Sequence, residues 1–340
     1  MALTLGGLYL LVLLVLCIRI ENLSFKRIAF LFLYLLLLGV AIFCNRTELR
    51  DYTNYINIFN HIEDEVGMEP SFKLISYFVK ACLGNNVFFL FAIYALLAVS
   101  IKFIAIRQLT DLWFLSILIY LSYFFAIHDL IQIRVGVASG ILLLTLKPLY
   151  ERKFWIFFSL ACLATFFHIS SLIIFLFWFL NPCKLKFYFW ISIIPIAYIL
   201  QFLQINFSSF LLLLPIKFVQ LKLIGYWQTK EMGLFEELNI FSMGILIRCV
   251  ICYVFIWKYK ILYSCNKYFL LLLKIYILGS FLLVFFSDLL VLAARLSELL
   301  FIVEIILIPM SIYLFRQRRM AMVFPIVFSG WLLFRCISMM

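Results

Sequence analysis

The sequence has little charge, and it has no stretch that is both long and polar. Of its 340 residues, 13% are charged and 67% are hydrophobic, and its mean hydropathy is +1.16. Soluble domains are roughly 45–50% apolar. The composition therefore argues against a separate soluble domain anywhere in the chain.

The sequence also lacks the motifs of several enzyme classes. It contains no GxxxxGK[ST] and no GxGxxG, which argues against an ATP-driven or nucleotide-sugar enzyme working from the cytoplasm. Its nine cysteines are scattered, mostly within apolar runs, so we expect small core residues and no metal site. No clear internal repeat of the kind found in carriers is present.

What the sequence has instead is apolar runs that recur from one end to the other. A helix needs roughly 20 apolar residues to cross the hydrocarbon core. The runs predict an all-α, polytopic integral membrane protein of about 12 transmembrane helices, within a range of roughly 10–12, with 1–340 as a single transmembrane domain. Segment 1–17 has no basic stretch before it and no cleavage site, so we expect a retained first span with its N-terminus outside.

The net charge of +12 is gathered in short clusters between the apolar runs. Basic clusters in alternate loops are the positive-inside pattern, which favours a membrane protein over one that binds nucleic acid. The basic loops, assigned to the cytoplasm, are 19–27, 102–112, 147–153, 181–186, 258–267 and 316–319. The external segments are then 45–73, 128–134, a tip at His168, 206–240, 287–297 and the C-terminus.

Four segments need a more specific interpretation. Tyr52, Tyr55, Ile56 and Phe59 fall at helical spacing, which predicts an amphipathic helix in loop 45–73. Loop 206–240 indicates a re-entrant or interfacial helix. Segment 154–180 is long for one span and short for two. We expect a hairpin of two short helices with His168 at its tip, the alternative being one tilted helix; segment 113–146 is ambiguous in the same way.

Four motifs, in order along the chain, carry a family resemblance. They are RDYTNYINIF followed by MEPSF, IQIRVGVASGI, LACLATFFHISSLI and LAARLSELL. In this order they resemble the EpsG-like branch of the Wzy-type polymerases, which build O-antigen and other bacterial surface polysaccharides. The resemblance covers most of the chain. In the second motif, Val135 stands where the family often has glutamine, and Gln132 precedes the arginine instead.

The resemblance implies a GT-C-like glycosyltransferase in the bacterial inner membrane, acting on its periplasmic face. The enzyme would transfer a glycan from one undecaprenyl pyrophosphate to the sugar of another lipid-linked repeat unit. The partners implied are undecaprenyl-pyrophosphate-linked oligosaccharide, the lipid bilayer and a chain-length regulator protein, with no nucleic acid. We expect no nucleotide, flavin, nicotinamide or metal cofactor.

Ionisable groups at membrane depth are costly, so they indicate working residues. A pyrophosphate needs a permanent cation that matches its oxygens in a fork, which favours arginine. Arg134 and Arg295 are the candidates. The alternative for each is an arginine that snorkels to the interface or pairs with Asp129 or Glu298. His168 suits the base that accepts the proton of the acceptor hydroxyl. Its alternatives are a histidine that binds phosphate or sugar, and a structural histidine within the bundle.

Other polar residues are assigned to the substrate. Asp51 and Asp129 are rival bases, each of which could instead be a loop charge or an arginine partner. Tyrosines stack on sugar faces and offer a hydroxyl. The residues expected to line the sugar and pyrophosphate groove are Arg50, Asp51, Tyr52, Tyr55, Glu69, Asp129, Gln132 and Glu298.

Two further points complete the expectations. Arg248, Lys274 and Glu304 lie inside predicted spans, where we expect them to be buried and paired. The functional alternatives are a lipid-linked oligosaccharide flippase or other multipass transporter, and another lipid-carrier glycosyltransferase such as an O-antigen ligase.

Overall fold

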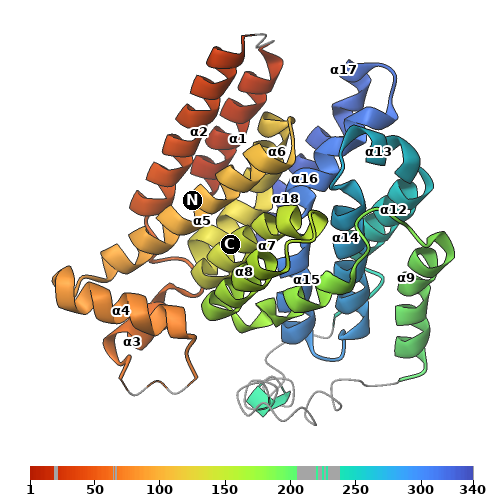
Figure 1. The fold of residues 1–340 in the computed structure, drawn as a ribbon. Helices are drawn as coiled ribbons and strands as arrows, with labels where there is room; N and C mark the ends of the chain where they lie inside the picture. The colour runs from red at the N-terminus through yellow and green to blue at the C-terminus, as the bar shows by residue number, and fades with distance from the viewer. Residues whose placement is uncertain are drawn as a thin grey trace. The chain divides into compact units, whose positions relative to one another are not determined.

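The computed structural model describes residues 1–18, 22–63, 65, 67–204, 220, 224–225, 227–228 and 238–339. The described residues contain helices and connecting turns and no strand (Figure 1). They divide into two compact units: unit 1 is Met1–Trp178 with Glu304–Met340, and unit 2 is Phe179–Val303. The expectation of a single transmembrane domain over 1–340 stays a prediction, and most of loop 206–240 lies outside the described residues.

The helices of unit 1 are α1 (Ala2–Cys17), α2 (Leu23–Phe43), α3 (Tyr52–Asn60), α4 (Pro70–Cys82), α5 (Val87–Leu109), α6 (Trp113–Ile119), the π-helix η1 (Tyr120–Ile131), α7 (Ile133–Tyr150), α8 (Phe154–Phe167), the 3₁₀-helix η2 (Ile169–Phe179), α16 (Glu304–Leu307), the 3₁₀-helix η3 (Ile308–Leu314), α17 (Arg318–Ala321) and α18 (Val323–Met339). The described helices of unit 2 include α9 (Phe187–Phe202), α12 (Met243–Trp257), α13 (Tyr259–Cys265), α14 (Phe269–Phe285) and α15 (Leu290–Phe301).

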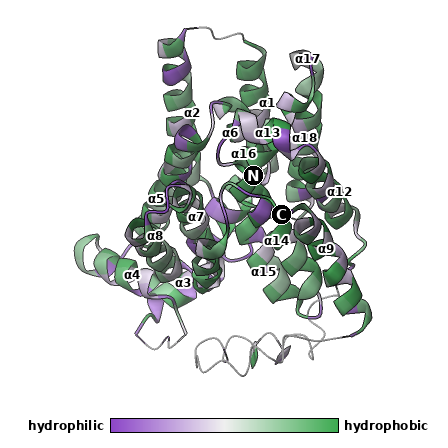
Figure 2. Ribbon diagram, turned by 45° about the vertical axis from the view of Figure 1, so that its right-hand side comes forward, coloured by the Kyte–Doolittle hydropathy of each residue, from purple (hydrophilic) through white to green (hydrophobic). Residues whose placement is uncertain are grey.

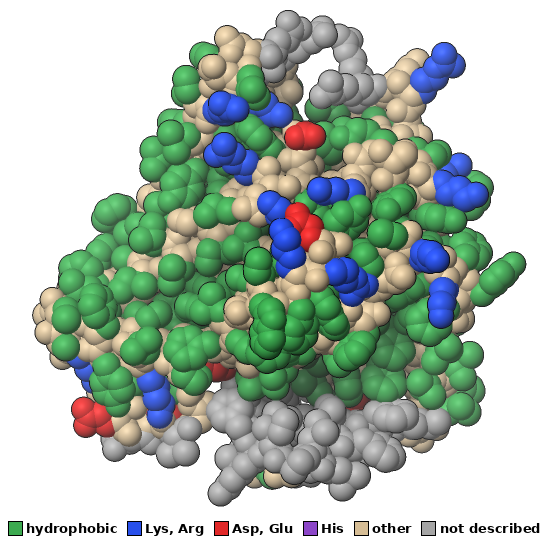
Figure 3. Space-filling view, in the orientation of Figure 1, with side chains coloured by type: hydrophobic (Ala, Val, Ile, Leu, Met, Phe, Trp, Pro, Cys, Tyr) green, Lys and Arg blue, Asp and Glu red, His purple; other side chains and the backbone are tan. Residues whose placement is uncertain are grey.

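Among the described residues, four helical segments are long and apolar enough to cross a membrane: Leu23–Phe43, Val87–Leu109, Trp113–Ile131 and Ile133–Tyr150. Seven shorter helices of 10–17 residues are also apolar. Figure 2 shows hydrophobic residues along most of these helices, and Figure 3 shows apolar side chains over much of the visible surface. A surface of this kind suits lipid rather than water, so the chain is a membrane protein. The number of about 12 spans stays a prediction.

The long helices of unit 1 differ in how deeply they are buried. Only 17% of the most apolar window of α2 is buried, against 89% of the window in Trp113–Ile131. The segment formed by α6 and η1 packs against α1, α5, α7 and α18. It is therefore the central helix of unit 1, and α2 lies at its periphery.

The basic connections of unit 1 meet at one end of its helix bundle. Lys26 donates from Nζ to the carbonyl oxygen of Asp111 at 3.0 Å, which joins loop 19–27 to loop 102–112. Ile312 and Ala321, on either side of the predicted loop 316–319, form a core cluster with Leu115, and Leu112 packs against it. Because α7 runs back from the opposite end, its C-terminal turn at 147–153 also lies at this basic end.

The predicted external segments of unit 1 gather at the other end. Met1 lines the same cavity as Cys44 and Asn45, where α2 finishes, and the ring of Phe43 lies 6.0 Å from that of Phe88 at the start of α5. α3 and α4 lie at this end as well (Figure 1). Within unit 1, the predicted basic loops and the predicted external segments therefore lie at opposite ends of the bundle, as the charge pattern predicts. Which end faces the cytoplasm stays a prediction.

Segment 154–180 is the expected hairpin. The rings of Phe154 and Phe158 lie 5.1 Å and 5.3 Å from those of Trp178 and Phe175, so the second limb returns alongside the first. The 14 residues of α8 extend about 21 Å and the 11 residues of the 3₁₀-helix η2 about 22 Å. The limbs match in length although they differ in residue number, and His168 lies at the tip in extended backbone conformation.

Two predicted loop boundaries are wrong. Lys102 belongs inside α5 and is fully buried, so the basic connection begins after it. His128 and Asp129 belong to η1 and are also fully buried. The predicted external segment 128–134 is therefore shortened to the residues around Gln132. Both errors have one cause. The prediction treated an ionisable residue in an apolar run as part of a loop. Each of these residues instead lies in a helix and is buried against neighbouring helices.

Unit 2 also departs from the predicted boundaries. α15 begins at Leu290, so Arg295 is in mid-helix rather than in an external loop 287–297. α15 packs on α14 because Gly279 leaves room: a Cβ there would approach Phe301 Cε1 to 3.0 Å.

The ionisable groups inside helices are buried as expected. Lys274 donates to the backbone carbonyls of Asn181 and Lys184, and the guanidinium of Arg248 lies 4.3 Å from the ring of Phe301. Glu304 is fully buried. The partner identified for Lys274 is backbone rather than an acidic side chain.

The prediction that the cysteines are core residues is wrong for most of them. All nine are free thiols, and Cys249, Cys252 and Cys336 are the buried ones. Five are exposed, namely Cys17, Cys82, Cys162, Cys183 and Cys265.

Candidate functional site

The carboxylate of Glu69 joins the two best-placed candidates of unit 1. Its Oε2 accepts from Nη1 of Arg134, and its Oε1 lies 3.3 Å from Nδ1 of His168. The Glu69 side chain is 1% exposed, that of His168 4% and that of Arg134 16%. We call these three residues the bridging cluster. It is located at the end of unit 1 opposite the basic connections.

Three chain segments supply this cluster, and each does so at a helix boundary. Glu69 precedes Pro70, the first residue of α4, where proline suits the start of a helix because its missing N–H would have no partner there. Arg134 is in the first turn of α7, after the break at Gln132. His168 ends α8 at the hairpin tip. A carboxylate held at such a junction can contact both neighbours without breaking a helix.

Aromatic side chains surround the bridging cluster. The guanidinium of Arg134 lies 5.4 Å from the ring of Tyr55 and 6.0 Å from that of Phe72, and its Nη1 lies 3.0 Å from Met68 Sδ. The rings of Tyr55 and Phe72 are stacked at 5.7 Å. A cation beside ring faces in a site shielded from water is stabilised more than one in solution. This wall holds the arginine in place.

Tyr55 belongs to the predicted amphipathic helix, which the structure confirms as α3 with Tyr55 and Phe59 on its buried face. Burial raises the pKa of the Tyr55 hydroxyl, and the charges of Asp51 and Glu69 act in the same direction while Arg134 opposes them. The phenol therefore remains neutral near pH 7. It can donate and accept hydrogen bonds beside the guanidinium without adding charge.

A second buried cluster lies deeper in unit 1. Lys102 donates to Asp129 Oδ1 at 2.5 Å and to the carbonyl of Gly136 at 2.7 Å, and the Tyr120 hydroxyl donates to Asp129 Oδ2. We call Lys102, Asp129 and Tyr120 the internal cluster. Every one of its side chains is fully buried or nearly so, and each ion finds a partner of opposite charge or a hydrogen-bond partner.

The π-helical geometry of η1 explains how this second cluster forms. Tyr120 and Asp129 are nine positions apart, about two and a half turns of an α-helix, which would place them on opposite faces. The wider i→i+5 turn of a π-helix brings them to the same face. Gly136 allows α7 to approach closely, since a Cβ there would lie 2.5 Å from the His128 carbonyl oxygen.

The remaining candidates divide between the two units. Arg50 is exposed, and Asp51, Tyr52 and Gln132 are half-buried. Tyr52 stacks on Phe91 at 5.4 Å. Arg295 and Glu298 are half-buried residues of α15 in unit 2. Their roles as pyrophosphate and substrate ligands stay predictions, as do those of the unit 1 residues.

Two outcomes concern the acids. The alternative interpretation of Arg134 as an ion-pair residue holds, but its partner is Glu69 and not Asp129 or Glu298. Asp129 is the partner of a lysine rather than an arginine, and its carboxylate is occupied on both oxygens by Lys102 and Tyr120. Its assignment to a substrate groove stays an untested prediction, although its surroundings are those of a structural ion pair.

Sequence reasoning missed several buried polar residues. Arg46 is 5% exposed, with its guanidinium 4.6 Å from the ring of Phe91, and Nε and Nη1 have no partner among the described residues. His128 is fully buried, and neither ring nitrogen has a hydrogen-bond partner in the described part of the chain. Arg46 belongs to no local motif that could have revealed its burial, whereas His128 lies in the apolar run that became η1. Over the same residues, no group of three or more His, Cys, Asp or Glu is placed to hold a metal ion.

Taken together, these features define a class: a helical membrane protein with an arginine and a histidine bridged by a buried carboxylate at one end of the bundle. Comparison with known proteins narrows the class. The model of the EpsG family matches residues 8–340, and the chain belongs to that family. No curated protein and no solved structure matches the chain significantly.

Proposed function

We propose that the protein is a polysaccharide polymerase of the Wzy type in the bacterial inner membrane. It joins undecaprenyl-pyrophosphate-linked oligosaccharide repeat units into O-antigen or a related surface polysaccharide on the periplasmic face. Membership of the EpsG family supports a polymerase of this kind. The contacts of Glu69 with both Arg134 and His168 are the observation that supports a role for these particular residues.

The reaction is a glycosyl transfer between two lipid-linked saccharides. The acceptor hydroxyl oxygen forms a bond to the anomeric carbon of the donor, and the bond from that carbon to the pyrophosphate oxygen breaks. The hydroxyl proton goes to His168, and undecaprenyl pyrophosphate leaves with the electron pair. Because Nδ1 of His168 faces Glu69, Nε2 is the nitrogen that accepts the proton.

Glu69 has two tasks in this scheme. It orients the imidazole through Nδ1, and it stabilises the imidazolium that forms when the proton arrives, as a carboxylate does in a catalytic triad. It also fixes the guanidinium of Arg134 at the same place. One carboxylate thus sets the distance between the proton acceptor and the cation.

Arg134 serves the leaving group. Its guanidinium is engaged in part, by Glu69, Met68 and the Tyr55 hydroxyl, and Nε has no hydrogen-bond partner among the described residues. A guanidinium offers five N–H donors in a fixed fork, so donors remain for phosphate oxygens. Arg295 is proposed as the second pyrophosphate ligand. Arg50, Tyr52 and Tyr55 are proposed as the residues that contact sugar.

The test uses purified protein with a lipid-linked repeat unit, and cells whose surface polysaccharide is separated on a gel. Arg134→Ala and Arg295→Ala should each abolish or shorten polymer at normal expression. Arg316→Ala is the matched control because Arg316 is an exposed arginine at the basic end of unit 1. Full-length polymer from both site variants would overturn the residue assignment.

The product separates the polymerase from its rivals. Loss of a polymerase leaves single capped repeat units outside the cell, whereas loss of a flippase removes all polymer and leaves substrate inside. An O-antigen ligase would move chains onto lipid A core without lengthening them. Longer lipid-linked chains made by the purified protein therefore distinguish polymerisation from both transport and ligation.

A further inference from the structure

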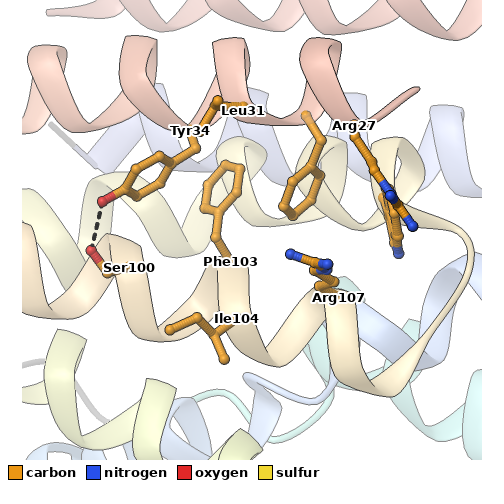
Figure 4. Close-up of a pocket in the computed structure, with 9 residues that line it drawn as sticks. Arg27, Leu31, Tyr34, Ser100, Phe103, Ile104 and Arg107 are labelled. Carbon is orange, nitrogen blue, oxygen red and sulfur yellow. Dashed lines mark hydrogen bonds between the residues drawn. The ribbon is translucent and has the colours of Figure 1, made fainter. Parts of the chain in front are cut away.

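Unit 1 also contains a cavity of about 370 Å³ between α2 and α5 at the basic end (Figure 4). Arg27 and Arg107 lie close together at one end of this cavity, and Tyr34 and Ser100 lie at the other (Figure 4). The wall between them is apolar, made of Phe30, Leu31, Phe103, Ile104 and Trp113. Nothing in the proposed reaction uses this cavity.

The cavity has the form of a short groove with its cations at one end. Arg27 and Tyr34 on α2 are seven positions apart, as are Arg107 and Ser100 on α5, which is about 10 Å of helix. The hydroxyls of Tyr34 and Ser100 are hydrogen-bonded at 2.9 Å, which closes the far end with a neutral pair. Leu31 and Ile104 are 55% and 48% exposed, so the groove opens on the apolar surface of the protein.

Aromatic contacts hold the wall rigid. The ring of Phe30 lies 5.0 Å from the rings of both Phe103 and Trp113, and that of Tyr34 lies 5.4 Å from Phe103. Lys26 lies 4.4 Å from the Trp113 ring and donates to the Asp111 carbonyl. Lys26 is therefore engaged in structure, whereas Arg27 and Arg107 are exposed and have no carboxylate partner among the described residues.

We propose that this groove binds an anionic phospholipid of the surrounding bilayer. The phosphodiester is held between the guanidinium groups of Arg27 and Arg107, and an acyl chain lies along the Phe30–Phe103 wall. Two arginines match phosphate oxygens in a fork. A groove that is open to lipid at its side and cationic at the headgroup end suits a two-part ligand of this type.

The chemistry selects the occupant. Zwitterionic lipids place a cation next to the phosphate, which two guanidinium groups repel. A soluble phosphate compound would gain nothing from the apolar wall, where Leu31 and Ile104 are exposed. A phospholipid with an anionic headgroup satisfies both ends of the groove.

The test measures lipid binding by native mass spectrometry of the full-length protein in detergent. Phosphatidylglycerol should bind with at least tenfold preference over phosphatidylcholine. Arg27→Ala with Arg107→Ala should weaken phosphatidylglycerol binding roughly thirtyfold, since each cation near a headgroup contributes on the order of fivefold. Lys147→Ala with Arg316→Ala removes equal charge outside the groove and should leave binding unchanged.

A second variant probes the apolar wall. Ile104→Trp obstructs the groove without changing charge, and it should also release phosphatidylglycerol while leaving the protein monodisperse. Equal retention of both lipids, or unchanged binding by the Arg27/Arg107 double variant, would overturn the proposal. Preferential retention of a polyprenyl phosphate added as competitor would overturn the assignment to bilayer phospholipid. None of these readouts depends on polymer synthesis, so the proposed reaction could fail while the lipid site stands.

Discussion

The bridging cluster and the internal cluster are built from similar groups but differ in their surroundings. In the internal cluster, Lys102, Asp129 and Tyr120 come from helix interiors, and the carboxylate is engaged on both oxygens. In the bridging cluster, Glu69, Arg134 and His168 come from helix ends, and the arginine side chain is 16% exposed. The first arrangement is closed and the second has access to the exterior. The comparison separates a structural ion pair from a site that can receive a ligand.

The largest effect is expected at His168. His168→Ala should lower the rate of polymerisation about 10²–10⁴-fold, the usual contribution of a general base. Melting temperature in detergent should change little, because the residue lies at a hairpin tip. His61→Ala, an exposed histidine, is the matched control. If the His168 variant polymerises at the wild-type rate, the bridging cluster is structural like the internal one.

In the internal cluster the expected loss is of stability rather than of rate. Asp129→Ala leaves Lys102 buried without its counter-ion, which costs about 3–5 kcal/mol. Removing both charges with Asp129→Leu and Lys102→Met should restore most of that loss. Unfolding measured with denaturant in detergent tests this, with the exposed Asp111→Ala as control. A double variant less stable than Asp129→Ala would contradict the assignment.

Glu69→Gln should give an intermediate effect. The amide oxygen can still face Nδ1 of His168, but the ion pair with Arg134 is lost. A charge-assisted hydrogen bond contributes about 1.5–3 kcal/mol, so the rate should fall roughly 10- to 150-fold. Glu63→Gln in the same loop controls for loss of charge. A rate as low as that of His168→Ala would instead make Glu69 indispensable to proton transfer.

The smallest effect is expected at Gly136. Gly136→Ala places a Cβ 2.5 Å from the His128 carbonyl oxygen and 2.7 Å from Asp129 Oδ1, so α7 must shift away from η1. Overpacking of this kind costs about 1–3 kcal/mol. Gly39→Ala on α2 meets no atom within 4 Å and is the control. Equal melting temperatures for the two variants would mean that α7 and η1 adjust without strain.

Local signals in the sequence predicted the parts of the site that depend on local structure. Helical spacing predicted α3, and the length of segment 154–180 predicted a hairpin with His168 at its tip. The partners were not predicted, because a contact such as Glu69 with Arg134 joins residues 65 positions apart and leaves no periodic trace. Lys102 was misplaced because positive charge is informative about topology only when it is in a loop. Residue type alone does not distinguish a lysine buried against a carboxylate from a lysine in a cytoplasmic loop.

The two limbs of the hairpin have a consequence for how the histidine is positioned. Because α8 and η2 extend equally far, the chain leaves beside Arg152, which donates from Nη1 to the Trp178 carbonyl at 2.6 Å. The position of the His168 imidazole along the bundle is therefore set from the opposite end of the hairpin. It depends on the length of the two limbs and on the hydrogen bond between Arg152 and Trp178. Residues near 152 and 178 should then tune the reaction from a distance, without ever meeting a sugar.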